Sequence, residues 1–193
     1  MSKEASTRRL SRDDWTAEAL RALGAGGLAS VAIEPIAARL GATKGSGYWH
    51  FRGRADLVAA TLARWEAEHT DAVIARADTG AGPVDRLREL LRAVLGRSGP
   101  FSVELALLAS SDDPLVAPTV RRVTQRRIDY LTTLFRTLGF DPAQADRRAL
   151  VAYTTYLGHA QLARTAPDAV PQGGPARQAY LNAVLATLLG PSG

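Results

Sequence analysis

The fold is decided by residues 35–57, which read PIAARLGATKGSGYWHFRGRADL. This stretch predicts a short helix over Pro35–Leu40, a tight turn at Gly41 and a second short helix over Thr43–Phe51. A third helical pattern begins near Arg54. Two short helices joined by a glycine-containing turn are typical of a helix-turn-helix, whose second helix lies in the major groove of DNA.

The segment before this stretch predicts one more helix. Ser11 is followed by Asp13 and Asp14, which is typical of a helix start, because the hydroxyl caps a backbone N–H and the carboxylates suit the positive end of the helix dipole. Apolar residues then recur at helical spacing, and several glycines follow them. The apolar positions are Trp15, Ala19, Leu20 and Leu23, and the glycines are Gly24, Gly26 and Gly27.

Helical periodicity continues to the end of the chain, and no segment has the alternation of a strand. The helical patterns cover residues 55–73, 87–95, 101–109, 120–138, 143–164 and 175–189. We therefore expect an all-α protein. Residues 1–54 would form a three-helix N-terminal head that contains the helix-turn-helix, and residues 55–193 a C-terminal helical domain.

Positive charge is concentrated in the head. Its 54 residues hold nine Lys and Arg against five Asp and Glu, whereas the rest of the chain holds fifteen against fourteen. An excess of this kind fits a nucleic-acid partner, although a basic N-terminus that only improves solubility remains an alternative. The basic arm of residues 1–10 is a further candidate for DNA contact, with a frayed terminus as the alternative.

The remaining composition excludes several classes. The 193 residues include no Cys, so disulfide frameworks and thiolate metal sites are excluded. No apolar run reaches the roughly 18 residues of a membrane span, and the polar first ten residues do not resemble a signal peptide. We expect a cytoplasmic protein.

The head resembles the DNA-binding head of the tetracycline-repressor (TetR) family over roughly residues 10–60. The resemblance is carried by Ile36-Ala37, Leu40-Gly41, Thr43-Lys44-Gly45, Tyr48-Trp49-His50-Phe51, Arg54 and Leu57, in this order and spacing. It implies a homodimeric transcription regulator, usually a repressor that binds a palindromic operator and is released by a small molecule. The C-terminal domain would then bind the effector and form the dimer.

The resemblance also implies which residues touch DNA. Phosphate contacts carry over to Thr43, Lys44, Tyr48, His50 and Arg54. Lys44 and Ser46 are the candidates for base edges, with backbone contact as the alternative for Lys44. We place Phe51 in the core, while Trp49 either packs internally or lies against the DNA backbone.

Two positions depart from the family pattern. Ala32 stands where a capping Thr or Ser is usual, and the loss of such a cap costs about 1 kcal/mol. Gly47 stands where an apolar side chain usually joins the small core. A glycine in a helix costs roughly 1 kcal/mol relative to alanine, so we expect a marginally stable head that Gly47→Phe would stabilise.

Aromatic and polar residues of the C-terminal domain together predict an apolar pocket with a few polar groups, although any single one of them is more often an ordinary core residue. They are Trp65, Phe101, Glu104, Tyr130, Tyr153, Tyr156 and His159. Arg126 and Arg127, beside Asp129, are interpreted as a solvated face rather than a ligand clamp. We expect no cofactor and no metal site, because His69 and His159 lack metal-ligand spacing.

The last two helices are where the family dimerises. Gly158 and Ala160 would permit close helix approach, and Leu181, Leu185 and Leu188 predict an apolar seam that a monomer would expose. Packing of that seam within the monomer is the alternative.

Two other functions remain open. One is a DNA-binding regulator without a small-molecule effector. The other is a small helical enzyme, which is disfavoured because the chain has no Cys and only His50, His69 and His159 as histidines.

Overall fold

The computed structural model describes residues 9–95 and 102–190, apart from the side chain of Ser102, and every regular element in these ranges is a helix. The all-α prediction is confirmed. The α-helices are α1 (Arg12–Gly26), α2 (Ile33–Leu40), α3 (Lys44–His50), α4 (Arg54–Glu66), α5 (Ala72–Ala77), α6 (Pro83–Leu95), α7 (Ser102–Leu108), α8 (Ala117–Thr137), α9 (Pro142–Thr165) and α10 (Gly174–Leu189). Two 3₁₀ turns lie at Leu28–Ser30 and Pro167–Ala169.

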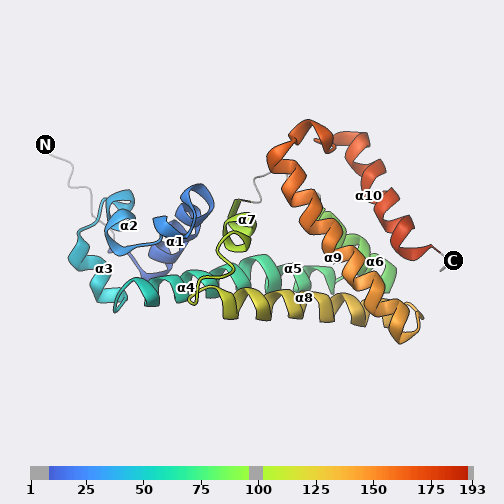
Figure 1. Cartoon of the computed structure of the whole chain (residues 1–193), viewed down its shortest axis with the longest axis horizontal. Coiled ribbons are helices and arrows are strands. Elements are labelled where there is room, and N and C mark those ends of the chain that lie inside the picture. Colours follow the sequence, from blue (N-terminus) through green and yellow to red (C-terminus); the bar gives the residue numbers. More distant parts are fainter. Residues whose placement is uncertain (1–8, 96–101, 191–193) are drawn as a thin grey trace, which may run out of the picture.

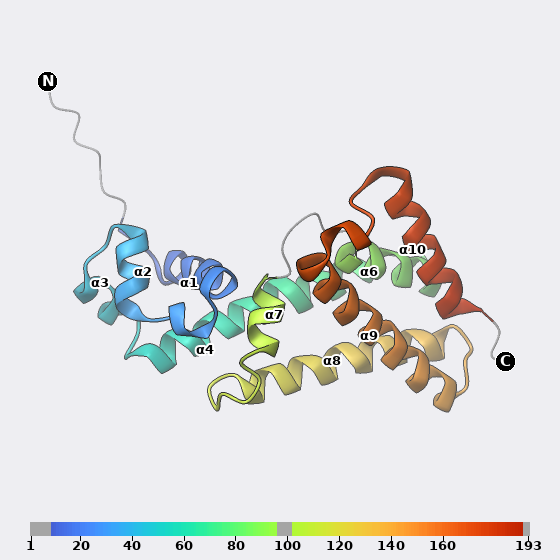
Figure 2. The same ribbon diagram turned by 45° about the horizontal axis from the view of Figure 1, so that its top comes forward.

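The helices form an elongated molecule with the head at one end (Figure 1). Helices α1 to α3 pack beside the start of α4, and the line of α4 continues through α5 towards the opposite end, where α6, α9 and α10 gather. Figure 2 shows α7 between these two ends, next to α1. The part of the chain expected to touch DNA is therefore far from the last two helices.

The long helical pattern after residue 54 contains an irregularity that the sequence did not predict. Between α4 and α5, residues Ala67–Asp71 form a π-helical turn, and Thr70 in this turn is buried. Isolated π turns occur mostly as single bulges within α-helices, frequently at functional sites.

Two hydrophobic clusters form the core. The first contains most of the buried residues of α1 to α4, centred on Trp15, Phe51 and Trp65, and extends to Leu107 on α7 and Val123 on α8. It thus crosses the predicted boundary after residue 54, so the packing of the head depends on helices of the C-terminal domain.

The second cluster joins α6, α8, α9 and α10 around residues such as Leu87 and Phe135. Within the described ranges, no helix is both long enough and apolar enough to cross a membrane.

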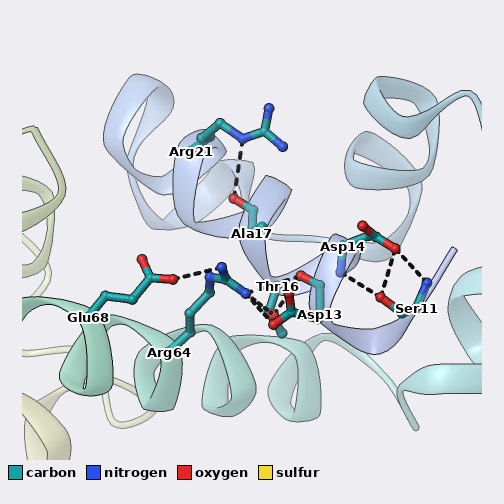
Figure 3. A network of polar contacts seen from close by, with 8 residues as sticks. All are labelled: Ser11, Asp13, Asp14, Thr16, Ala17, Arg21, Arg64 and Glu68. Carbon is teal, nitrogen blue, oxygen red and sulfur yellow. Dashed lines mark hydrogen bonds and ion pairs between the residues drawn. The ribbon is translucent and has the colours of Figure 1, made fainter. Parts of the chain in front are cut away.

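Two of the predicted helix caps in the head are confirmed, and so is the predicted absence of a cap at a third helix. Ser11 and Asp14 form a reciprocal capping box at the start of α1, and Asp14 accepts from the Ser11 backbone N–H at 2.8 Å (Figure 3). Thr43 caps α3. The N-cap of α2 is Ala32, which makes no side-chain cap.

One arginine fixes α1 against α4. Arg64 on α4 lies 2.5 Å from a carboxylate oxygen of Asp13 on α1 and 2.7 Å from a carboxylate oxygen of Glu68 in the π-helical turn that follows α4 (Figure 3). The same guanidinium reaches the Thr16 hydroxyl at 3.4 Å. Contacts between residues this far apart in sequence set how the head sits on the long helix.

Candidate nucleic-acid interface

Helix α3 is held at its N-terminus and exposed along one side. The Thr43 side chain accepts a hydrogen bond from the Ser46 backbone N–H at 3.2 Å, and Gly41 supplies the left-handed residue (φ 64°) that turns the chain out of α2. Tyr48 is 50% exposed and Trp49 is 82% exposed. Trp49 therefore does not pack in the core, and it lies on the surface beside Tyr48.

The next residues anchor α3 from behind. Phe51 is buried, as expected, and its ring lies against those of Trp15 and His50. His50 Nε2 lies 3.0 Å from the Leu10 carbonyl oxygen, so this ring nitrogen already has a partner within the protein. A phosphate contact by His50 would have to use its other nitrogen or replace Leu10.

Lys44 lies at the start of α3 and is paired within the head. Its ammonium group forms an ion pair with Glu34 on α2, and both side chains are largely exposed. The hydrogen bond and the charge of Glu34 raise the pKa of Lys44, so the group is positively charged at neutral pH. A phosphate would exchange with Glu34 at the water-exposed surface.

Arg54 makes contacts that the sequence did not suggest. Its Nε donates to the Val31 carbonyl oxygen at 3.1 Å, and its Nη2 donates to the Leu28 carbonyl oxygen at 3.1 Å. Arg54 therefore fixes the 3₁₀ turn that precedes α2. Its phosphate contact stays a prediction.

A polar groove next to α3 adds two basic residues to the candidates. The groove has a volume of about 480 Å³ and is lined by Arg12, Tyr48, Trp49, His50, Phe51, Arg52 and Asp56. Arg12 lies 4.4 Å from the centre of the Phe51 ring and 3.0 Å from a carboxylate oxygen of Asp56. The Arg52 backbone N–H, and next Arg12, lower the pKa of Asp56.

Arg12 and Arg52 line this groove but were not among the predicted site residues. A phosphate that approached Tyr48 or Trp49 would lie beside both of these cations. The available sequence signal was that Arg12 follows Ser11, the capping residue of α1, and that Arg52 follows Tyr48-Trp49-His50-Phe51.

The interpretation of Gly47 was wrong. A Cβ atom on this buried glycine would lie 2.6 Å from Ile33 Cγ2 and 2.8 Å from Trp15 Cη2. The indole of Trp15 thus fills the space in which an apolar side chain was thought to be missing. Gly47→Phe would overpack the head and destabilise it.

A cavity in the C-terminal domain is lined by some of the residues predicted to bind a ligand. It is about 60 Å³ in volume and is lined by His69, Thr70, Val73, Ile74, Leu90, Leu91, Val94, Arg127, Tyr130, Leu131, Ala152, Tyr153 and Tyr156. The three predicted tyrosines are present. Burial, followed by nearby negative charge, raises the pKa of Tyr130 and of Tyr156, so both hydroxyls stay protonated.

The other predicted ligand residues lie elsewhere. Trp65 and Glu104 are buried next to Arg127, just outside the cavity lining. His159 is stacked on Tyr180 of α10, with ring centres 5.6 Å apart. Phe101 lies outside the described residues.

The interpretation of Arg127 as part of a solvated face was wrong. Its side chain is 11% exposed, and it forms a 2.7 Å ion pair with Glu104, which is 7% exposed. The neighbouring Arg126 is half exposed and pairs with Asp71 at 2.6 Å. A one-residue step along α8 therefore separates a buried cation from a surface cation.

The predicted dimer seam was also wrong. Leu181, Leu185 and Leu188 are buried within the monomer, where they pack in the second cluster. The exposed apolar face lies on α9 instead and contains Leu150, Val151 and Leu162, which are 53%, 50% and 46% exposed. Gly158 is exposed and has open space around it, on the same side of the helix.

Among the described residues, no group of three or more His, Asp or Glu side chains has an arrangement suited to a metal ion.

Comparisons with known proteins agree with this geometry. Residues 16–61 match the family model of bacterial regulatory proteins, tetR family. A putative transcriptional regulator from Pseudomonas aeruginosa PAO1 has the same fold, with 18% identity, coverage of 96% of this chain and 97% of that chain, and a TM-score of 0.74. No curated protein matches the sequence.

Two further solved structures contain ligands. A putative transcriptional regulator from Saccharomonospora viridis in complex with choline is 22% identical, with coverage of 89% of this chain and 93% of that chain and a TM-score of 0.76. The SmeT–triclosan complex is 21% identical, with coverage of 91% and 90% and a TM-score of 0.72. SmeT is the repressor of the Stenotrophomonas maltophilia multidrug efflux pump SmeDEF.

At these identities the solved structures show a shared fold, while the family model matches the segment that contains the helix-turn-helix. The matched segment includes α2, α3 and the exposed Tyr48 and Trp49. Residues 16–61 therefore form a DNA-binding domain of the tetR family of bacterial regulatory proteins, in which α2 and α3 are the helix-turn-helix.

Proposed function

We propose that this protein is a cytoplasmic transcriptional repressor that binds a palindromic operator as a homodimer and is released by a small molecule. The observation that supports it most is the exposure of Tyr48 and Trp49 on α3, next to a capped helix N-terminus. A large aromatic side chain that is 82% exposed is costly for a surface without a partner. Backbone N–H groups and the helix dipole at the start of α3 favour a phosphate.

The dimer would form through the exposed face of α9. Residues Leu150, Val151 and Leu162 supply apolar area, and Gly158 permits close approach of the partner helix. A two-fold axis at this end of the molecule would place two heads on successive major grooves, roughly 34–36 Å apart.

The effector would bind in the cavity of the C-terminal domain. The choline and triclosan complexes of structures with the same fold support a ligand-binding role for this domain. A ligand that binds better to the conformation unable to reach both grooves shifts the population away from DNA by its differential affinity alone.

A regulator without an effector is the second candidate, because the cavity of about 60 Å³ is far smaller than the roughly 300–1,000 Å³ of typical ligand pockets. It predicts that no compound changes the affinity for DNA. We also propose that the chain is not an enzyme, which the regulatory family supports.

Selection of bound sequences from random duplex DNA tests the proposal. We expect a palindrome with half-sites about one helical turn apart. Recovery of no preferred sequence would refute DNA-specific regulation, and recovery of a single asymmetric half-site would refute the dimer.

A further inference from the structure

Arg127 connects three parts of the molecule that surround the cavity. From α8, its Nη1 donates to Glu104 Oε1 on α7 at 2.7 Å. Its Nε donates to the Thr70 hydroxyl at 3.0 Å, and its Nη2 donates to the His69 carbonyl oxygen at 3.2 Å. Both acceptors lie in the π-helical turn between α4 and α5. One buried cation therefore holds α7, α8 and the irregular turn of the long helix together.

The guanidinium has unused capacity for hydrogen bonds. An arginine carries five N–H donors, and the described residues accept from three of those on Arg127, which leaves one on each terminal nitrogen. Glu104 binds Arg127 through Oε1, and its buried Oε2 accepts no hydrogen bond from the described part of the chain. The ion pair is thus weaker than the two-fold contact that a guanidinium can make with a carboxylate.

Burial is the largest single influence on Arg127 and lowers its pKa, but the charge and hydrogen bond of Glu104, together with Tyr156 and Tyr153, outweigh burial and hold that pKa above its usual value. The group is therefore charged and needs an anion. Breaking a buried ion pair without replacement is strongly unfavourable, so any ligand that displaces Glu104 must itself supply negative charge.

The residues that line the cavity determine which chemical groups the ligand can carry besides its anion. Apart from Arg127, Thr70 and His69, they are aliphatic side chains of α5, α6, α8 and α9 and the tyrosine rings of α8 and α9. A cationic ligand is disfavoured, because the buried positive charge of Arg127 already stands in the wall, 5.8 Å from the centre of the Tyr156 ring and 5.1 Å from that of the neighbouring Trp65.

We propose that the effector is a small apolar carboxylic acid whose carboxylate takes the place of Glu104 on Arg127. This inference rests on the proposed function, since it assigns the chemical class and the binding mode of the effector. The volume of about 60 Å³ has room for about four water-sized groups, so a larger acid must displace a wall of the cavity. The Glu104 side chain on α7 is the wall that competes with the ligand.

Helix α7, which carries Glu104, is in direct contact with the head. Helix α7 packs on α1, and its buried Leu107 belongs to the same hydrophobic cluster as Trp15 (Figure 2). Release of Glu104 removes the ionic contact that ties α7 to α8. The ligand thus acts on the head through α7, and a change in the contacts of the π turn acts on α4 at the same time.

Binding of matched acids and amides tests the ligand class. The probes are acetate, hexanoate, benzoate and phenylacetate, each paired with its uncharged amide, and binding to the purified full chain is measured by calorimetry. We expect at least one acid to bind about tenfold more tightly than its amide, because hydrogen bonds to a charged acceptor are the stronger ones. If no acid in the panel binds more tightly than its amide, the proposal is overturned.

Two variants locate the site. Glu104→Gln keeps the size of the side chain and removes the competing charge, so it should bind the preferred acid about tenfold more tightly. The double variant Arg127→Met with Glu104→Met removes both charges and should abolish the preference for acid over amide. Arg126→Met is the matched control and should leave the preference unchanged. An unchanged preference in the double variant would overturn the site.

DNA binding separates this inference from the proposed function. The preferred acid should weaken operator binding by the wild-type chain, and about tenfold less acid should suffice for Glu104→Gln. If the wild-type chain selects a palindrome but the acid leaves its affinity unchanged, only the inference fails. If no DNA sequence is selected, the proposed function fails first, while acid binding measured without DNA still decides the ligand class.

Discussion

At the scale of single residues, the packing of the head depends on one large and one small residue that lie far apart in the sequence. Trp15 is fully buried, and its ring occupies the space next to Gly47. The sequence shows a glycine in a helix and an aromatic residue near the chain start, but not that they touch. An estimate of stability from helix propensity alone therefore predicts an unfilled space at Gly47, although Trp15 fills it.

Gly47→Ala should destabilise the protein despite the better helix propensity of alanine. The added Cβ would approach Ile33 and Trp15 to less than 3 Å, and overpacking costs about 1–3 kcal/mol against a gain of about 1 kcal/mol. Gly45→Ala in the same helix is the control, because its Cβ would meet only the Thr43 hydroxyl at 3.9 Å. Urea unfolding of both variants decides, and equal effects would contradict the packing described here.

His159 predicts a loss of stability in mild acid. Burial, followed by the charge of Arg177, lowers the pKa of His159 in the folded protein. As the pH falls below about 6.5, the unfolded chain takes up a proton that the folded chain resists, so the free energy of unfolding decreases. His159→Gln should flatten this decrease between about pH 7 and 5. If His69→Gln flattens the profile equally, the assignment to His159 is wrong.

At the scale of elements, the starts of helices followed from the sequence and their long-range contacts did not. Caps at Ser11 and Thr43 act within three residues, so the local pattern was sufficient to find them. The π turn between α4 and α5 was not found, because hydrophobic spacing alone does not distinguish one extra residue in a long helix. The ion pairs of Arg64 and Arg127 join segments that only the fold brings together.

Arg64→Met should loosen α1 from α4. The side chain of Arg64 is 22% exposed, while that of Asp13 is 80% exposed, so solvent screens the pair and the expected cost is about 1 kcal/mol or less. Arg92→Met is the control, since Arg92 pairs with Glu89 in its own helix. Chemical denaturation should show the larger loss for Arg64→Met, and the reverse order would remove Arg64 as a link between head and long helix.

At the scale of the whole molecule, the direction in which each apolar face points could not be read from periodicity. The spacing of Leu181, Leu185 and Leu188 correctly marked a buried face, but the burial is against α6 and α9 within the monomer. The cavity was predicted from its tyrosines, yet its cation was placed on the surface, because a basic run on a helix is usually solvated. Burial by distant elements decides both cases.

The exposed face of α9 makes a prediction about assembly. Val151→Glu places a charge at the centre of this face and should convert a dimer into a monomer, since an unpaired charge in an interface is strongly unfavourable. Leu115→Glu introduces the same charge at another exposed apolar position and should leave the dimer intact. Sedimentation at micromolar concentration distinguishes them. A wild-type chain that is monomeric under these conditions would refute the dimer.

The central claim is that α3 and its neighbouring cations hold DNA phosphates. The most direct measurement is the dependence of operator affinity on salt concentration for the wild type, Lys44→Ala and Arg92→Ala, since both variants lose one positive charge and Arg92 lies on α6, outside the head. The logarithm of the affinity should fall linearly with the logarithm of salt concentration, and Lys44→Ala should weaken binding and reduce the slope by about 1. Arg92→Ala should match the wild type. Equal slopes and affinities for Lys44→Ala and Arg92→Ala would contradict the account.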